Sequence, residues 1–485
     1  MSRISVIGAG AGGLAVAARL AAKRHEVTVF DTADRVGGKL YTLRRDGFAF
    51  DTGPSLFTLP AVYRDLFMHT GPPLESEIDL QECEPGFAYQ FGDGSRLELP
   101  GSSMGRTVAA IGDQFGPSAG ESWRELMRRA ADIWRLTRTN VLGTAIRGRR
   151  QLMSLSRPRD LRTVAPWRSL HDMGTDALTD SRLVTLLDRY ATYSGSQPRK
   201  APGAFITIPY VEATFGMWHI GGGLGNLADA LCRRAEKAGA QFRLGTGVRS
   251  IDTCNGAVTG VVTDSDEMVP ADIVVSDVDS RRLPAMWGDD AASTQTDSYS
   301  GFAILAAVAG TTDGLRHHSV WFPADYDGEF TDLAAGRPVA DPAIYVCRPV
   351  DPQMAPPGDE AWFILVNAPR HAPDAPDGHD WSDDAANERY ADDVLDLLAR
   401  RGMDIRHRVR WRILQTPFDL GLRDGSGDGA IYGTAAHGAM SVLHRAQNIG
   451  PVRGLFRVGG TAHPGGGLPL VGMSAEIVAE EIGRA

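Results

Sequence analysis

The first thirty residues constrain the fold more than any other part of the chain. A short apolar run, residues 4–7, leads into the segment Gly8-Ala9-Gly10-Ala11-Gly12-Gly13. An alanine-rich stretch follows, and a second apolar run ends at Asp31. A strand, a tight glycine turn, a helix and a second strand that ends in an acid form the dinucleotide-binding fingerprint. The sequence therefore predicts a Rossmann-like α/β domain.

Each part of this fingerprint has a physical task. Gly8 allows the tight turn, Gly10 lets a pyrophosphate approach the backbone, and Gly13 lets the helix pack on the sheet. Amides at the helix N-terminus then face the phosphates. Asp31 is placed to accept hydrogen bonds from an adenosine ribose, and its charge would repel the 2′-phosphate of NADP. Alone, this pattern indicates a dinucleotide without saying which one.

Two further motifs narrow the choice to a flavin. Arg35-Val-Gly37-Gly38-Lys39 follows the acid, and Gly53-Pro54-Ser55 comes soon after. The first of them resembles the second motif of a flavoprotein superfamily that includes amine oxidases and carotenoid desaturases, in which the cofactor is FAD. Arg35 and Lys39 would offset phosphate charge. The expected FAD-binding residues, later segments included, are Gly8, Ala9, Gly10, Ala11, Gly12, Gly13, Asp31, Arg35, Gly38, Lys39, Gly53, Pro54, Ser55, Val248, Gly459, Gly460, Gly472 and Met473.

Composition excludes several other classes of protein. The 485 residues carry a net charge of −10, which argues against a nucleic-acid partner. No apolar run approaches the roughly 20 residues that span a bilayer, and no signal peptide is expected. The four cysteines are far apart and predict reduced thiols, as in the cytoplasm. The acidic, proline-rich segment 371–380 predicts a solvated loop, and no metal site is expected anywhere.

One basic stretch stands out in this acidic chain. Residues 121–170 contain twelve arginines against four acidic residues, interleaved with Trp, Leu, Ile and Met. This composition is typical of helices that lie on an anionic membrane surface. The alternative is an ordinary amphipathic helix with a solvated basic face. We expect a cytoplasmic protein bound peripherally to the inner face of the cell membrane.

The order of motifs predicts a cofactor domain built from separate segments. Its parts are expected at residues 1–71, 211–280 and 451–485. A β-rich connection is expected at 72–104, a helical basic lid at 105–210 and a mixed-sheet substrate domain at 281–450. In the last part a strand meets glycines and then a helix expected at residues 475–482, whose N-terminus would stabilise negative charge on a reduced flavin.

That last segment, 454–474, completes a resemblance to the bacterial phytoene desaturases, a family of carotenoid dehydrogenases. The resemblance spans nearly the whole chain, and its specific part is the mid-chain blocks 299–305, 317–322, 325–330, 342–345, 351–358 and 416–419. Departures from the family pattern include Arg457, Thr461 and Gly466. They leave FAD binding expected, but they leave the substrate open, because the family also contains 3,4-desaturases, isomerases and saturases.

The resemblance implies an FAD enzyme that introduces carbon–carbon double bonds into a long isoprenoid polyene by hydride transfer to flavin N5. Oxygen or a quinone would reoxidise the flavin. The rivals are a flavin-dependent isomerase or saturase, a later 3,4-desaturase, an amine or protoporphyrinogen oxidase, and a prenyl-lipid carrier without catalytic flavin. His219 and His463 stand in glycine-rich motifs, but both are expected to hold local backbone, so no catalytic side chain is assigned.

Overall fold

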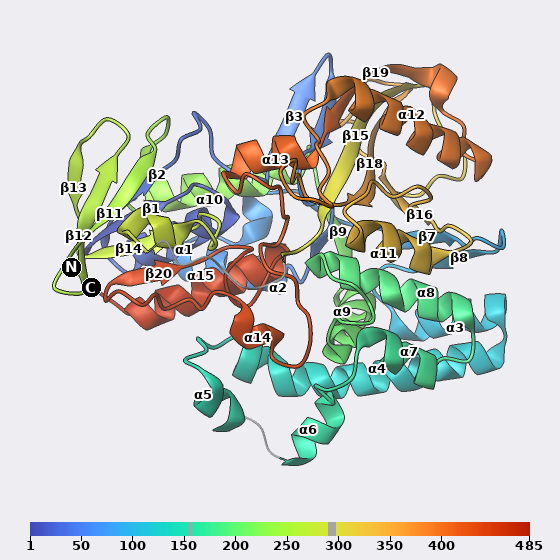
Figure 1. The fold of residues 1–485 in the computed structure, drawn as a ribbon, viewed down its shortest axis with the longest axis horizontal. Coiled ribbons are helices and arrows are strands. Elements are labelled where there is room, and N and C mark those ends of the chain that lie inside the picture. The colour runs from blue at the N-terminus through green and yellow to red at the C-terminus, as the bar shows by residue number, and fades with distance from the viewer. Residues whose placement is uncertain (155–157, 290–296) are drawn as a thin grey trace.

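The centre of the cofactor half is a five-stranded parallel sheet. A computed structural model describes residues 1–154, 158–289 and 297–485 (Figure 1). The sheet has the order β10-β2-β1-β14-β20, and every neighbouring pair is parallel. Its strands are β1 (Arg3–Ile7), β2 (Glu26–Phe30), β10 (Gln241–Arg243), β14 (Ile273–Ser276) and β20 (Leu455–Arg457). Three distant stretches of chain therefore share one sheet.

Helices of small and apolar residues pack around this sheet. They are α1 (Ala11–Ala22), α2 (Ala61–Thr70), α10 (Gly225–Lys237) and α15 (Leu468–Ile482). α1 contacts the other three and is buried along most of its length, because alanine and glycine let the neighbouring helices approach closely. The Rossmann-like α/β domain that the sequence predicts is confirmed.

The helix α15 begins seven residues earlier than the sequence predicts. It starts at Leu468, not at Ala475, directly after Gly467 at φ 90°. Pro469 does not break it, because the first turn of a helix leaves its backbone N–H groups without intrahelical partners.

Smaller sheets surround the cofactor half. One has the order β11-β12-β13, with β11 (Val248–Cys254), β12 (Ala257–Thr263) and β13 (Met268–Pro270). A hairpin joins β3 (Thr42–Arg45) to β4 (Phe48–Asp51). A third sheet has the order β5-β9-β6, with β5 (Phe57–Thr58), β6 (Leu80–Glu82) and β9 (Met217–Ile220).

The other half of the molecule is built on a seven-stranded mixed sheet, of order β19-β15-β18-β17-β16-β7-β8. The strands are β7 (Phe87–Gln90), β8 (Arg96–Leu99), β15 (Ser300–Ala309), β16 (His318–Trp321), β17 (Ile344–Cys347), β18 (Asp359–Ala368) and β19 (Val409–Gln415). Side chains of β15 alternate between two cores: Phe302 and Ile304 pack toward α12 (Asp384–Arg400), while Ala303 and Leu305 face the helical region. Short helices α11 (Tyr326–Ala334), α13 (Pro417–Asp424) and α14 (Ser441–His444) connect these parts.

The α-helices of residues 104–215 form the region below this sheet in Figure 1. They are α3 (Met104–Phe115), α4 (Pro117–Thr137), α5 (Arg149–Ser154), α6 (Pro158–Val164), α7 (Leu170–Ala177), α8 (Ser181–Arg189) and α9 (Thr207–Phe215). In the described part of the chain no helix combines the length and apolar character needed to cross a membrane.

The basic stretch divides into two parts of different character. On α4, Trp123 and Leu126 belong to the core, while Arg124 and Arg128 pair with acidic neighbours of the same helix. α4 is thus an ordinary amphipathic helix. Arg149 and Arg150 lie on α5 and Arg162 lies on α6, at the edge of the molecule. Leu155 and Arg157, which also belong to this stretch, lie outside the described residues.

Candidate active site

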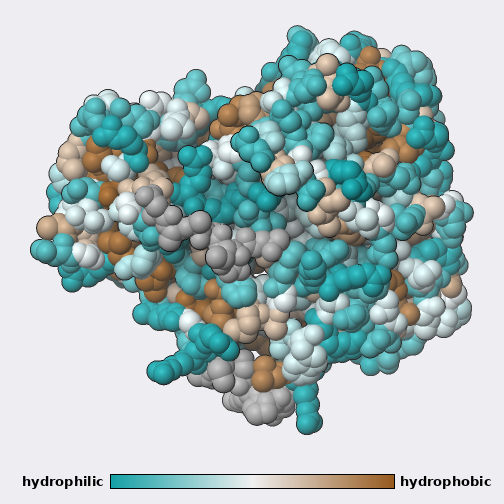
Figure 2. Space-filling view, in the orientation of Figure 1, coloured by the Kyte–Doolittle hydropathy of each residue, from teal (hydrophilic) through white to brown (hydrophobic). Residues whose placement is uncertain are grey.

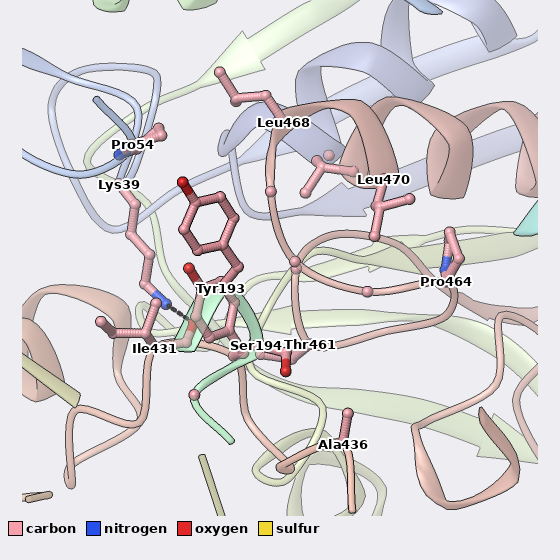
Figure 3. A pocket seen from close by; sticks show the side chains of 18 of the residues that line it. Lys39, Pro54, Tyr193, Ser194, Ile431, Ala436, Thr461, Pro464, Leu468 and Leu470 are labelled. Atoms are coloured by element: carbon pink, nitrogen blue, oxygen red, sulfur yellow. Dashed lines mark hydrogen bonds between the residues drawn. The ribbon is translucent and has the colours of Figure 1, made fainter. Parts of the chain in front are cut away.

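A single large cavity joins the two halves of the molecule. Its volume is about 1910 Å³, and it runs from the glycine-rich loop after β1 to the helix-facing side of the seven-stranded sheet. Figure 3 shows one part of it, where Lys39, Pro54, Tyr193 and Leu470 surround a common space. Most of the lining is apolar. A cavity of this size holds a dinucleotide or a long apolar ligand.

The glycine loop leaves no room for side chains. A Cβ on Gly13 would lie 1.9 Å from the carbonyl oxygen of Gly8, and one on Gly12 would lie 2.8 Å from the Cα of Gly459. Gly8 has φ +100°, a conformation that only glycine adopts without strain. The loop therefore presents bare backbone to the cavity at the N-terminus of α1, as a phosphate site requires.

Asp31 stands at the end of β2, where the sequence predicts it. Its two oxygens accept hydrogen bonds from the Ala9 amide at 2.7 Å and the Ala33 amide at 2.8 Å. These bonds fix the carboxylate beside the glycine loop, and the residue lines the cavity. A carboxylate has about four acceptor sites, so it retains capacity for ribose hydroxyls.

A second acid at this loop was missed by the sequence analysis. Asp277 follows β14 and accepts a hydrogen bond from the Gly13 amide at 2.9 Å. Burial raises the pKa of Asp277 to about 7; the Gly13 bond opposes that rise and the charge of Asp31 adds to it. The available signal was its place at the carboxyl end of a strand of the same parallel sheet.

The two cations of the second motif, Arg35 and Lys39, have different partners. The Arg35 guanidinium lies 3.7 Å from the centroid of the Tyr41 ring, a cation–π contact. Lys39 Nζ lies 2.7 Å from a carboxylate oxygen of Asp424 and donates to the carbonyl of Ile431 at 3.2 Å. The Ile431 bond is drawn in Figure 3. Lys39 therefore ties the cofactor half to the loop that follows α13.

Most of the expected FAD-binding residues meet at the cavity. Its lining includes Gly8, Gly10, Ala11, Gly12, Asp31, Arg35, Gly38, Lys39, Gly53, Pro54, Ser55, Val248 and Gly460. Ala9, Gly13, Gly459, Gly472 and Met473 do not line it. Gly472 lies within α15, where a Cβ would meet Val62 of α2 at 2.6 Å, so this glycine permits helix packing. The first turn of α15, residues 468–471, lines the cavity.

The cavity wall also contains a buried cation, which no sequence motif predicts. Arg189, at the end of α8, is 8% exposed and lines the cavity. The rings of Phe87, Tyr193 and Tyr345 surround its guanidinium carbon at 5.3, 5.2 and 5.5 Å. Because these rings come from segments far apart in the chain, local sequence patterns gave no signal.

The two glycine-flanked histidines lie outside the cavity lining. His219 Nε2 contacts a carboxylate oxygen of Asp351 at 2.8 Å, and the same oxygen accepts the Gly222 amide. His463 Nε2 lies 2.9 Å from the carbonyl oxygen of Val141. Both rings brace the chain around them, and the absence of an assigned catalytic side chain stays a prediction.

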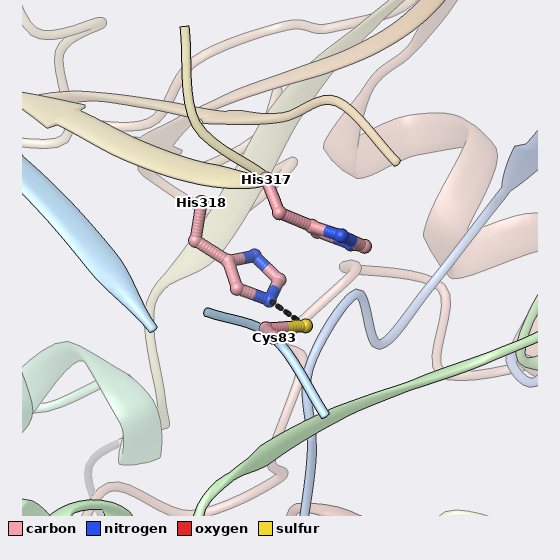
Figure 4. Close-up of side chains that lie close together, drawn as sticks. All are labelled: Cys83, His317 and His318. Atoms are coloured by element: carbon pink, nitrogen blue, oxygen red, sulfur yellow. Dashed lines mark hydrogen bonds between the residues drawn. The ribbon is translucent and has the colours of Figure 1, made fainter. Parts of the chain in front are cut away.

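A small cluster at the start of β16 brings a distant cysteine next to two neighbouring histidines. Donor atoms of Cys83, His317 and His318 lie within 4.8 Å of one another (Figure 4). Cys83 Sγ and His318 Nε2 are hydrogen-bonded at 3.8 Å, and His318 Nδ1 is bonded to Tyr345 Oη at 2.8 Å. Burial lowers the pKa of His318 to about 3, so this ring is neutral. Among the described residues no fourth histidine, cysteine or acid joins this group.

Comparison with known proteins gives these features a family. Residues 11–293 match the model of the flavin containing amine oxidoreductases. A 4,4'-diapolycopene oxygenase of Methylomonas sp is 31% identical, over 99% of this chain and 98% of that protein. A 1-hydroxycarotenoid 3,4-desaturase of Flavobacterium sp. (strain P99-3) is 28% identical, over 99% of both. The solved cyclohexylamine oxidase of Brevibacterium oxydans IH-35A superposes with a TM-score of 0.62 at 14% identity, covering 100% of each chain.

The chain belongs to the flavin containing amine oxidoreductase family. Within it, full-length similarity places the chain among the phytoene desaturase-like members, and it is an FAD-dependent oxidoreductase. The cavity fits that cofactor, because the glycine loop forms a cradle that any Cβ would fill. Gly10 and Gly12 would hold the pyrophosphate, and Asp31 would hold the ribose.

Proposed function

We propose that the protein desaturates a long isoprenoid polyene of the carotenoid type, with a phytoene-like hydrocarbon skeleton. One observation carries this proposal: the cavity that begins at the FAD cradle continues as one space of about 1910 Å³, with mostly apolar walls, to the helix-facing side of the seven-stranded sheet. A polyene is apolar along its whole length, and apolar walls suit it. The carotenoid enzymes among the relatives support the same substrate class.

Desaturation removes a hydride and a proton from adjacent carbons. Bound FAD supplies a two-electron acceptor at its N5 position. In a polyene the carbon that loses hydride is allylic, so the cation is delocalised and its neighbouring proton is acidic. The chain then has three tasks: to align the polyene, to exclude water and to stabilise charge. Apolar residues such as Leu56, Ile208 and Leu470 line the cavity and exclude water.

We further propose that the cavity opens toward a membrane. Arg149 and Leu152 of α5 line it together with Leu161 and Val164 of α6. Leu161 is 40% exposed and the nearby Trp167 is 67% exposed, so two large apolar side chains lie at the surface beside these helices. Figure 2 shows small apolar patches among hydrophilic residues in the lower part of the view, near the place of α5 and α6 in Figure 1. A polyene dissolved in lipid would enter here.

The test is the visible spectrum of FAD-loaded protein incubated with liposomes that contain phytoene. We expect structured absorbance that grows and moves from the ultraviolet into the blue as conjugated double bonds accumulate, and the final position counts the desaturation steps. A protein that retains FAD but leaves the spectrum unchanged would contradict desaturation of this substrate. A later 3,4-desaturase, an isomerase or a saturase would then be tested with a more conjugated polyene.

A further inference from the structure

Arg189 is a cation buried where the proposed hydrocarbon substrate gives it nothing to bind. Its side chain lies inside the molecule, at the end of α8, and it lines the same cavity as the FAD cradle. Three aromatic rings that also line the cavity surround it. Burying a charge is costly unless it is compensated by partners, so this position demands a reason.

The surroundings of Arg189 favour its charge through tyrosines, and not through a direct carboxylate partner. Among the described residues no ion pair of Arg189 with a carboxylate is found, and its Nη1 donates a hydrogen bond to Tyr193 Oη at 3.0 Å. The nearby Glu212 accepts a hydrogen bond from Tyr190 at 2.8 Å instead. Burial raises the pKa of Glu212 to about 7, which weakens it as a counter-ion. A guanidinium has five N–H donors, so most of them remain available.

The aromatic rings around Arg189 fix the direction of its remaining N–H donors. The ring of Tyr193 contacts the guanidinium and its hydroxyl accepts from it, while the Tyr345 hydroxyl is fixed by Ser55 and His318 at 3.0 and 2.8 Å. Stacked rings stabilise the cation without consuming its donors. Arg189 therefore presents preorganised N–H groups inside an apolar chamber, and such groups gain most from an acceptor oxygen that water does not reach.

We propose that Arg189, held by Tyr193, binds an oxygen-bearing end group of the substrate: a hydroxyl, carbonyl or carboxylate at one end of the polyene. This inference rests on the proposed function, because it takes the polyene as the occupant of the cavity. It goes beyond that function by assigning a polar subsite and by making an oxygenated polyene the preferred substrate over the plain hydrocarbon.

The experiment compares two polyenes of equal length and conjugation, one with a terminal hydroxyl and one without. Their dissociation constants are measured from the absorbance shift on binding to FAD-loaded wild type, Arg189→Leu and Arg189→Lys. We expect wild type to prefer the hydroxylated polyene about 10-fold or more, the yield of one charge-assisted hydrogen bond. Arg189→Leu should lose this preference, because it weakens binding of the hydroxylated polyene far more than binding of the hydrocarbon, and Arg189→Lys should restore part of the preference.

Arg182→Leu is the matched control, because Arg182 lies on the same helix but does not line the cavity. It should keep the wild-type preference. Equal loss of both polyenes in Arg189→Leu, or loss of FAD from that variant, would show a structural or cofactor role and overturn the subsite. Wild type that binds both polyenes equally would also overturn it. A failure of the proposed function would give a different result: either polyene would bind tightly, but no new double bond would form.

Discussion

The two ends of the cavity recognise their ligands in opposite ways. The cofactor end is made of backbone, from a contiguous loop that tolerates no side chain at Gly12 or Gly13. The substrate end is made of side chains, among them Arg189, Tyr193 and Tyr345, which come from different elements. Under the proposed function, the first end would select a ligand common to many enzymes, and the second would select by shape and by a few placed polar groups. On this proposal the cradle fixes the chemistry, and the side chains around Arg189 fix the specificity.

The largest effect is expected from a substitution that fills the glycine loop at the cofactor end. Gly12→Val places a side chain against the backbone of Gly459, which cannot move without displacing the start of the following loop. We expect FAD affinity to fall by about 100-fold or more, from overpacking and blocked approach. The flavin absorbance of the purified variant measures this. Gly105→Val is the control, because a Cβ there meets nothing within 4 Å and the residue is exposed on α3. Normal FAD content in Gly12→Val would refute the cradle.

Asp277 gives the cofactor end a pH dependence. Since burial raises its pKa in the folded protein to about 7, above the ~3.9 of an unfolded chain, folding favours the protonated form. Stability is therefore lost as pH rises from about 4 to about 7 and is level above that. Asp277→Asn removes this loss, so we expect it to raise the free energy of unfolding by about 1–3 kcal/mol at pH 8 and by little at pH 4.

Urea denaturation of the FAD-free protein at the two pH values measures this effect. The exposed Asp113 of α3 offers a control, because Asp113→Asn should show no such difference between the two conditions. FAD should also bind more tightly to Asp277→Asn at pH 8, because one negative charge fewer shares the helix N-terminus with the pyrophosphate. An effect of Asp277→Asn on stability that does not change with pH would contradict the raised pKa of Asp277.

The smallest expected effect concerns the mouth of the substrate end. Arg149→Glu with Arg150→Glu reverses two exposed charges of α5, and we expect binding to anionic liposomes to weaken about 10-fold or more. Arg147 is left unchanged, because it already pairs with Glu481 at 2.6 Å. The control, Arg389→Glu with Arg400→Glu on α12, changes the charge equally on a remote helix. Equal co-sedimentation of both variants with liposomes would contradict the proposal that α5 faces the membrane.

Sequence predicted one end of the cavity far better than the other, for a physical reason. A glycine loop and the acid after the second strand are local signals, so the amino-acid sequence alone predicts where the loop and Asp31 lie. Arg189 looks like any basic residue of an amphipathic helix until the fold surrounds it with rings from β7 and β17. Asp277 reaches the loop only because β14 pairs with β1. Contacts between distant segments leave no periodic trace in the chain.

The basic stretch, residues 121–170, shows a second limit of prediction from sequence alone. Its composition fits both a membrane surface and an ordinary helix, and only burial separates them. Trp123 on α4 is in the core, whereas Trp167 near α6 is exposed. Interleaved arginine and tryptophan thus described two different environments within fifty residues of chain.

The most direct test of the whole account is a single anaerobic turnover. FAD-loaded protein is mixed with its polyene without any electron acceptor, and the flavin and polyene absorbances are followed together. The account predicts that the flavin bleaches in step with the gain of one double bond per FAD, since the hydride and its electrons have nowhere else to go. A polyene that changes while the flavin stays oxidised would contradict desaturation and indicate an isomerase, with the FAD cradle left standing.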